Sequence, residues 1–259
     1  AAAAPRLHVL AVGIDHYQAG MNLAFARADA LAIHSFFKPG LFAEVKAEAL
    51  TDSQATRQAV LGALARLKQE TAPQDTVLIY LAGHGTTIAD VFYFMPCDAR
   101  VDSDQSLRQT CLSSTELGQA LDDIPATKQI LVLDACHSGA SNKALSRLVG
   151  ARDAMNRVRA QQRLARSSGV FLIAASTAEQ AAKEYPELGH GVLTYAILRA
   201  LGEGGRPEAV DDQGTVTANS LLTYVAREVP RLTRKFQGSE QIPVQFSTGQ
   251  DFPLVTSGD

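Results

Sequence analysis

Three short and strongly apolar runs constrain the fold of this chain more than any other feature. They span residues 7–14, 76–82 and 129–134. A nearly continuous apolar run of this length is typical of a strand that is buried on both faces of a parallel sheet. Helical patterns separate the runs, so we predict an α/β fold. Its form would be a three-layer αβα sandwich around a mostly parallel sheet of about six strands.

Weaker patterns complete the expected elements. Shorter apolar runs predict the remaining strands, at residues 45–50, 170–175 and 243–246. Apolar side chains at helical spacing predict helices at residues 24–37, 192–201 and 218–229. Residues 51–54 and 113–116 each resemble a capping box, and they predict helices that end near residues 69 and 122. Residues 91–95 are expected to form a hairpin arm beside the run at 76–82.

The composition argues against two large classes of partner. Hydrophobic residues make up 46% of the chain and charged residues 20%, the balance of an ordinary globular protein. No apolar stretch approaches the roughly 20 residues that a membrane-spanning helix needs, so we expect no membrane partner. A formal net charge of −3 gives no reason to expect nucleic acid as a partner.

The cysteines indicate a reducing compartment. Cys97, Cys111 and Cys136 are too few and too unevenly spaced for a disulfide framework, and they lack the spacing of a zinc site. We therefore expect a cytoplasmic location. The start, residues 1–5, lacks the regions of a signal peptide and is compatible with a linker, an artificial extension or a processed precursor. No internal repeat is evident, so we predict one domain over residues 1–259.

Two of the buried runs end in residues that can carry out covalent chemistry. The run at 76–82 is expected to lead into a tight turn at Gly83-His84-Gly85, and the run at 129–134 into one that begins at Ala135-Cys136. In open α/β sheets ligands collect at the carboxyl ends of the strands, so neighbouring strands would bring His84 and Cys136 together. A thiol nucleophile needs a nearby imidazole that lowers its pKa or accepts its proton. The Gly85 and Cys136 backbone N–H groups could then form an oxyanion hole.

Taken singly, these residues would carry little weight. A buried cysteine is usually a small hydrophobic residue, and a lone histidine in a loop is usually solvated. The pairing of two similar strand ends favours the functional interpretation. Cys97 and Cys111 keep the structural one, because neither has a histidine-bearing partner strand. His137, which follows the nucleophile, and His190, which opens a helix, are also interpreted as structural.

The ordered set of motifs resembles the caspase-like cysteine peptidases, most of all the metacaspases and the bacterial orthocaspases. GHG follows one strand and DACHSG the next, and LHVLAVGIDHY, GVFLIAAST and GHGVLTYAILRAL are also similar to those families. The resemblance covers nearly the whole chain. It implies a caspase fold with a large-subunit-like portion (1–141), a basic linker (142–167) and a small-subunit-like portion (168–259). It also implies endopeptidase activity through a Cys136 thioester, with His84 and the Gly85 backbone as partners.

Two carboxylates are candidates for substrate recognition. Asp134 lies two residues before Cys136, and residues i and i+2 of a strand face the same side. A carboxylate there can pair with a cationic side chain at P1, the substrate residue before the cleaved bond. In metacaspases this position lines the S1 pocket, as does an aspartate early in the first helix, which Asp29 matches. The resemblance thus implies a protein or peptide substrate that is cleaved after Arg or Lys.

Other interpretations of these residues stay open. Asp29 could be a solvated carboxylate favoured by the helix dipole, and Asp134 could cap a turn at the end of a strand. Ser176 matches a stretch that pairs with the substrate backbone in the family, but strand ends are often polar. Ala82 departs from the family pattern, because some metacaspases carry a serine there that helps to line S1.

A basic segment follows the nucleophile. It holds one acid, Asp153, and seven basic residues: Lys143, Arg147, Arg152, Arg157, Arg159, Arg163 and Arg166. Charge runs of this kind are usually solvated helices. The resemblance offers a second interpretation, since family members are often cut in this linker during maturation. An enzyme that cleaves after Arg would then process itself.

The resemblance leaves cofactors and one rival function open. Some metacaspases need calcium, but the acidic pairs Asp102/Asp104 and Asp122/Asp123 lack the spacing of a dedicated loop, so we expect no metal or other cofactor. A catalytically silent caspase-like scaffold or sensor is the main alternative, and bacterial relatives are often fused to repeat or sensor domains. A nucleotide-binding domain is disfavoured because no GxGxxG or P-loop follows the first strand.

Overall fold

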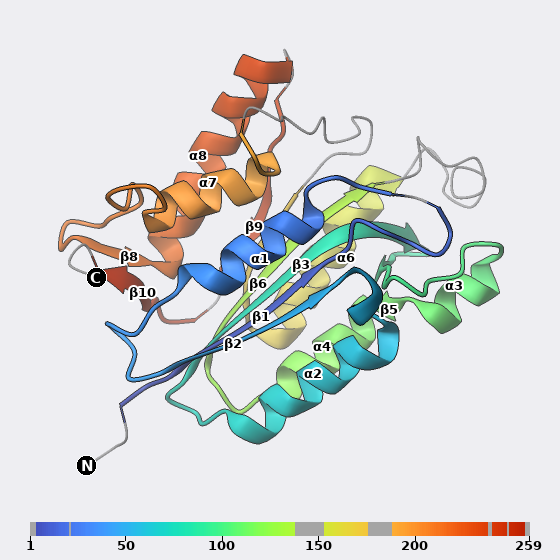
Figure 1. Ribbon diagram of the computed structural model, residues 1–259, viewed down its shortest axis with the longest axis horizontal. Coiled ribbons are helices and arrows are strands. Elements are labelled where there is room, and N and C mark those ends of the chain that lie inside the picture. Colours follow the sequence, from blue (N-terminus) through green and yellow to red (C-terminus); the bar gives the residue numbers. More distant parts are fainter. Residues whose placement is uncertain are drawn as a thin grey trace.

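The chain folds around one mostly parallel sheet. The structure is a computed structural model that describes residues 4–20, 22–137, 153–175, 188–237, 240–247 and 249–256. Across these residues the main path of the sheet has the order β2-β1-β3-β6-β7-β9 (Figure 1). Its strands are β1 (Leu7–Gly13), β2 (Val45–Thr51), β3 (Thr76–Ile88), β6 (Lys128–His137), β7 (Phe171–Ala174) and β9 (Val244–Phe246). All neighbours on this path are parallel except β9, which is antiparallel to β7, so the predicted fold class is confirmed.

Two small additions extend the strands. β4 (Val91–Phe94) forms the expected hairpin with β3, and β5 (Leu112–Ser113) pairs with β4. A separate two-stranded antiparallel sheet joins β8 (Thr215–Thr217) to β10 (Pro253–Thr256), which the sequence patterns did not predict.

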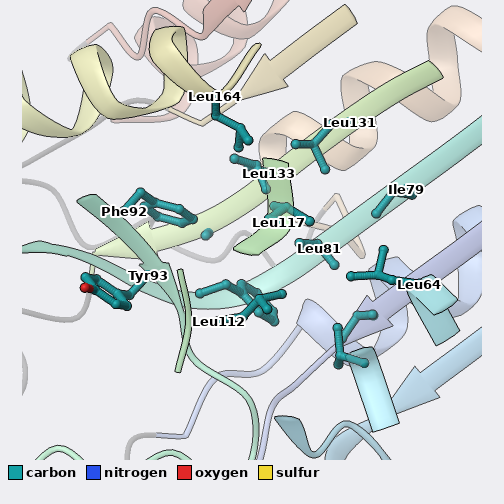
Figure 2. Close-up of a cluster of buried hydrophobic side chains, with 14 of the residues drawn as sticks. Leu64, Ile79, Leu81, Phe92, Tyr93, Leu112, Leu117, Leu131, Leu133 and Leu164 are labelled. Atoms are coloured by element: carbon teal, nitrogen blue, oxygen red, sulfur yellow. The ribbon is translucent and has the colours of Figure 1, made fainter. Parts of the chain in front are cut away.

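Helices cover both faces of the sheet and produce two hydrophobic cores. One face carries α1 (Ala26–Phe36), α7 (Val192–Leu201) and α8 (Ala218–Gln237), and the other carries α2 (Arg57–Glu70), α4 (Ser114–Asp123) and α6 (Asp153–Ser168) (Figure 1). The side chains of β3 alternate between the cores, because successive strand residues point to opposite faces. Figure 2 shows Ile79 and Leu81 of β3 in the core that also contains Leu164 of α6. The short α3 (Asp104–Thr110) precedes β5.

The two predicted capping boxes have different outcomes. Ser113 and Glu116 form one, each side chain accepting a hydrogen bond from the other residue's backbone N–H at the start of α4. The box predicted at residues 51–54 is wrong. Thr51 is the last residue of β2, where it pairs with Gly13, and residues 52–54 form a 3₁₀ turn. α2 begins later, at Arg57, and Thr56 caps it.

Both strands that carry the motif residues run further than expected. We expected a turn at residues 83–85, but β3 continues to Ile88 because its second half pairs with β4. The turn comes at Ala89 and Asp90, which have left-handed φ values of 48° and 66°. The glycines that suggested an earlier turn serve close packing instead. A Cβ atom on Gly85 would lie 2.6 Å from the ring of Phe92.

Two helices also differ in extent from their sequence patterns. α8, expected to end at 229, continues through Pro230 to Gln237. The later half of the predicted basic linker is α6, a helix that buries Ala160, Leu164 and Ala165 in the core of Figure 2. Within the described ranges, no helix combines the length and the apolar character needed to cross a bilayer.

Candidate functional site

His84 and Cys136 are direct neighbours in the sheet. β3 and β6 pair in parallel from Thr76↔Lys128 to Gly85↔His137, and this register sets His84 against Cys136. Adjacent strands lie about 4.8 Å apart, so two residues in the same row are close in space. Both residues stand toward the carboxyl ends of their strands, where open α/β sheets bind ligands. The structure therefore brings together the two residues that the sequence motifs singled out.

Tyr17, from the segment that follows β1, holds the backbone of His84. Its hydroxyl accepts a hydrogen bond from the His84 N–H at 2.8 Å, and the two ring centroids are 4.8 Å apart. Gly83 makes this contact possible, because a Cβ atom there would lie 2.4 Å from the tyrosine oxygen. Since His84 is buried as well, its imidazole has little freedom to turn away. The sequence patterns gave no reason to assign Tyr17 a role.

The other two cysteines are buried thiols. Cys97 follows β4, and Cys111 caps the end of α3. Burial raises the pKa of Cys97, and it raises the pKa of Cys111 to about 12. A thiol needs to ionise to act as a nucleophile, so both are chemically quiet near neutral pH.

Asp134 lies two residues before Cys136 on β6, and two hydroxyl groups donate hydrogen bonds to its carboxylate. Its Oδ2 atom accepts hydrogen bonds from Thr194 of α7 at 2.8 Å and from Tyr80 of β3 at 3.3 Å. The two hydroxyls also contact each other at 2.6 Å. Asp134 therefore does not cap a turn, since its strand continues past it. Ala82 pairs with Asp134 in the sheet, and the hydroxyls that contact this carboxylate come from Tyr80 and Thr194.

Asp29 reaches the same place from α1. It is 2% exposed, which excludes the solvated carboxylate that the helix position alone allowed. The Gly191 N–H donates to its Oδ2 at 3.0 Å, and Nδ1 of His190 lies 2.7 Å from its Oδ1. A Cβ atom on Gly191 would lie 3.0 Å from Asp29 Oδ2 and 3.5 Å from Asp134 Oδ2. The two carboxylates thus converge on a glycine that has no side chain to fill the space between them.

Burial makes both carboxylates costly to ionise, and the charge of Asp29 adds to this cost for Asp134. Burial raises the pKa of Asp134 to about 7, and the negative charge of Asp29 adds to that rise. Burial also raises the pKa of Asp29, although its contacts with His190 and Gly191 oppose the shift. Two like charges in a poorly solvated site favour a shared proton. A cationic group placed between them would remove that penalty.

The remaining expectations lie elsewhere or outside the described residues. Ser176 and the start of the basic linker are outside them. Within the described part of the chain, no group of three or more His, Cys, Asp or Glu residues is arranged to hold a metal ion. Of the acidic pairs considered for calcium, Asp102 and Asp123 form ion pairs with Arg100 and Lys68.

Replacing Asp134 by Asn should stabilise the fold more at alkaline than at acidic pH. Its folded pKa of about 7 exceeds the ~3.9 of an unfolded aspartate, so the stability that its proton contributes is complete below about pH 4 and is lost as the pH rises through 7. Asn keeps an acceptor for the Tyr80 and Thr194 hydroxyls without the charge. We expect the melting-temperature advantage of Asp134→Asn to widen between about pH 5 and pH 8.

Asp123→Asn is the matched control for this measurement. Its carboxylate pairs with Lys68 at the surface, and that contact lowers its pKa, so its variant should gain no advantage at higher pH. An Asp134→Asn advantage that is constant with pH would contradict the raised pKa of Asp134.

Comparisons with known proteins agree with this geometry. Residues 6–253 match the family model of the caspase domain. Among solved structures, protein GSU0716 from Geobacter sulfurreducens is similar at a TM-score of 0.62 and 17% identity, over 95% of this chain and 94% of that chain. The structure of pro-sf-caspase-1 is similar at a TM-score of 0.55 and 13% identity, over 95% and 92%. No curated protein matched the sequence. Structural similarity at such low identities establishes the fold alone. The family model covers nearly the whole chain, so the chain belongs to the caspase domain family.

Proposed function

We propose that this chain is a cysteine endopeptidase that hydrolyses peptide bonds after Arg or Lys. The observation that carries the proposal is the register of β3 and β6. It pairs His84 with Cys136, two residues beyond the pair of Ala82 and Asp134. Family membership supports peptidase chemistry, and two converging carboxylates, the buried Asp29 and the partly buried Asp134, support a basic P1 residue.

In the proposed reaction Cys136 attacks and His84 moves the proton. His84 takes the thiol proton, and the thiolate sulfur forms a bond to the carbonyl carbon of the substrate. The carbon–nitrogen bond then breaks as His84 returns that proton to the leaving amine, which leaves a thioester. Water, deprotonated by His84, hydrolyses the thioester and releases the free thiol. The Gly85 and Cys136 backbone N–H groups are proposed to stabilise the oxyanion in both steps.

The S1 site would select its substrate by charge. A guanidinium or ammonium group between Asp29 and Asp134 would stabilise the ionised form of both carboxyls, whose pKa values are raised by burial. An aspartate at P1 would add a third negative charge to the same poorly solvated space. Discrimination of this kind arises from repulsion of the wrong side chain as much as from attraction of the right one.

Cys136→Ala should abolish peptidase activity, and His84→Ala should lower it by several orders of magnitude, because each removes one partner of the proton transfer. An electrophilic probe with an Arg side chain should label the wild type at Cys136 only. Cys111→Ala is the matched control: it removes a buried, protonated thiol and should leave labelling intact. Substantial turnover by Cys136→Ala, or a fully folded wild type that the probe does not label, would favour the silent scaffold instead.

Arg substrates should exceed Asp substrates by several orders of magnitude in kcat/KM, because the Asp side chain meets like charge in S1. A library of peptides that differ only at P1 measures this directly. Asp29→Asn and Asp134→Asn should each raise KM for Arg peptides, whereas Asp123→Asn should not. A profile that prefers Asp at P1 would overturn the S1 assignment.

Self-cleavage in the basic linker is proposed as a third property, and the packing of α6 supports a cut before this helix. Arg159, Arg163 and Arg166 belong to α6, which packs on the core. Arg163 lies 3.8 Å from Asp90, and the Arg166 guanidinium lies over the Phe246 ring. The helix would have to unfold locally around a peptide bond before that bond could enter an active site. Residues 143–152, tethered near Cys136 at high effective concentration, are better candidates.

The cut is therefore expected after Lys143, Arg147 or Arg152. Mass spectrometry of new termini in purified protein should find it in the wild type and not in Cys136→Ala. Replacing these three residues by Ala should prevent it, and the control double variant Arg159→Ala/Arg163→Ala should still be cut. Cleavage inside α6, or an active enzyme that stays intact, would contradict the assignment.

A further inference from the structure

His190 closes one side of the pair of carboxylates. It precedes Gly191, the N-cap of α7, so a single short turn engages both oxygens of Asp29: one with the imidazole and one with the Gly191 N–H. The imidazole keeps 20% of its side-chain surface exposed, against 4% for Asp29. Solvent protons can therefore reach His190 without any opening of the fold.

Within the described part of the chain, the other ionisable groups that act on this site are acidic. They come from every element packed there: Asp29 on α1, Asp134 on β6, Tyr80 on β3, Asp15 after β1 and Glu203 after α7. Tyr80 is neutral, because burial raises its pKa well above the ordinary value. Among the described groups that act on the two carboxylates, His190 is thus the one that can become a cation.

We propose that His190 is a specificity residue of the S1 site: its protonation state sets the site's net charge and so controls affinity for a basic P1 side chain. When His190 is charged it already neutralises Asp29, so an incoming guanidinium meets a weaker negative potential at the carboxyl pair. When His190 is neutral it still hydrogen-bonds Asp29, but the full charge of that carboxylate is available to the substrate. This inference rests on the proposed preference for basic P1 residues. His190 acts through Asp29 and is not a catalytic residue.

The contact also sets the pH range over which the effect operates. The hydrogen bond to Asp29 raises the pKa of His190 above its ordinary value, although partial burial opposes the shift. Affinity for a cation should therefore rise as the pH increases through a value above ~6.5. By thermodynamic reciprocity, a bound cation must lower the pKa of His190. Ionisation of Asp134 adds to the same trend, so the two contributions have to be separated by substitution.

The test measures binding, so it does not depend on turnover. Benzamidine is a permanently charged mimic of the Arg side chain over this range, and calorimetry on the wild-type chain gives its Kd from about pH 5.5 to pH 8.5. His190→Gln keeps a hydrogen-bond donor toward Asp29 but cannot become charged. At the lowest pH it should bind benzamidine about tenfold more tightly than the wild type, and at the highest pH the two should agree within about twofold. His34→Gln, at the far end of α1, is the matched control and should follow the wild type.

A second measurement needs no variant. Titration of the His190 ring signals by NMR should show a lower pKa in the presence of saturating benzamidine than in its absence. If His190→Gln binds more weakly at every pH and the ring titration does not respond to benzamidine, His190 is only structural and the inference is wrong. If the folded wild type binds no benzamidine at any pH, the basic S1 site fails and the inference fails with it. Binding with the expected pH profile but without labelling of Cys136 would support His190 and contradict only the peptidase chemistry.

Discussion

The rest of the structure depends on the parallel ladder between β3 and β6. Its register sets two consecutive same-face rows, Ala82 with Asp134 and His84 with Cys136. Because side chains alternate along a strand, a slip of one residue would move one partner of each row to the opposite face of the sheet. The apolar residues that precede both rows are buried on both faces, and this burial is what fixes the register. The core and the site therefore have a common origin.

A second constraint is the close packing of helix α1 against the sheet beside those rows. Gly13 of β1 pairs with Ala82, and a Cβ atom there would lie 2.1 Å from the carbonyl oxygen of Ala26 and 2.5 Å from the Cβ atom of Ala30. Only glycine lets α1 approach the sheet this closely. Asp29, one turn into that helix, can consequently converge with Asp134 on Gly191. The absence of side chains at two glycines thus positions the carboxyl pair and leaves the space between its members open.

These two constraints explain what the sequence could and could not predict. Burial of whole strands leaves a local signal, so the six strands of the main sheet path, α7 and the neighbouring His84 and Cys136 followed from the pattern. The extension of β3 past residue 82 depends on its hairpin with β4, and the glycines that suggested a turn serve close packing. The contact of His190 with Asp29 joins positions 161 residues apart, so no local pattern reveals it. Sequence reasoning treated that histidine as the start of a helix and no more.

The proposed specificity depends on how costly it is to ionise the Asp29 and Asp134 pair when no cation is bound. Hydroxyl groups of Tyr80 and Thr194 and the Gly191 N–H satisfy individual oxygen atoms, but none of them brings a positive charge to the site. Burial, and after it the negative charge of Asp29, raises the pKa of Asp134 to about 7, so ionisation of the site carries a penalty. A group that relieves it must be cationic and must reach the space beside Gly191, and an uncharged side chain of the same size would leave it in place. The penalty that makes the empty site less stable at high pH is therefore also what would make it selective for Arg or Lys under the proposed function. His190, at the edge of the site, is placed to change the net charge that the substrate encounters.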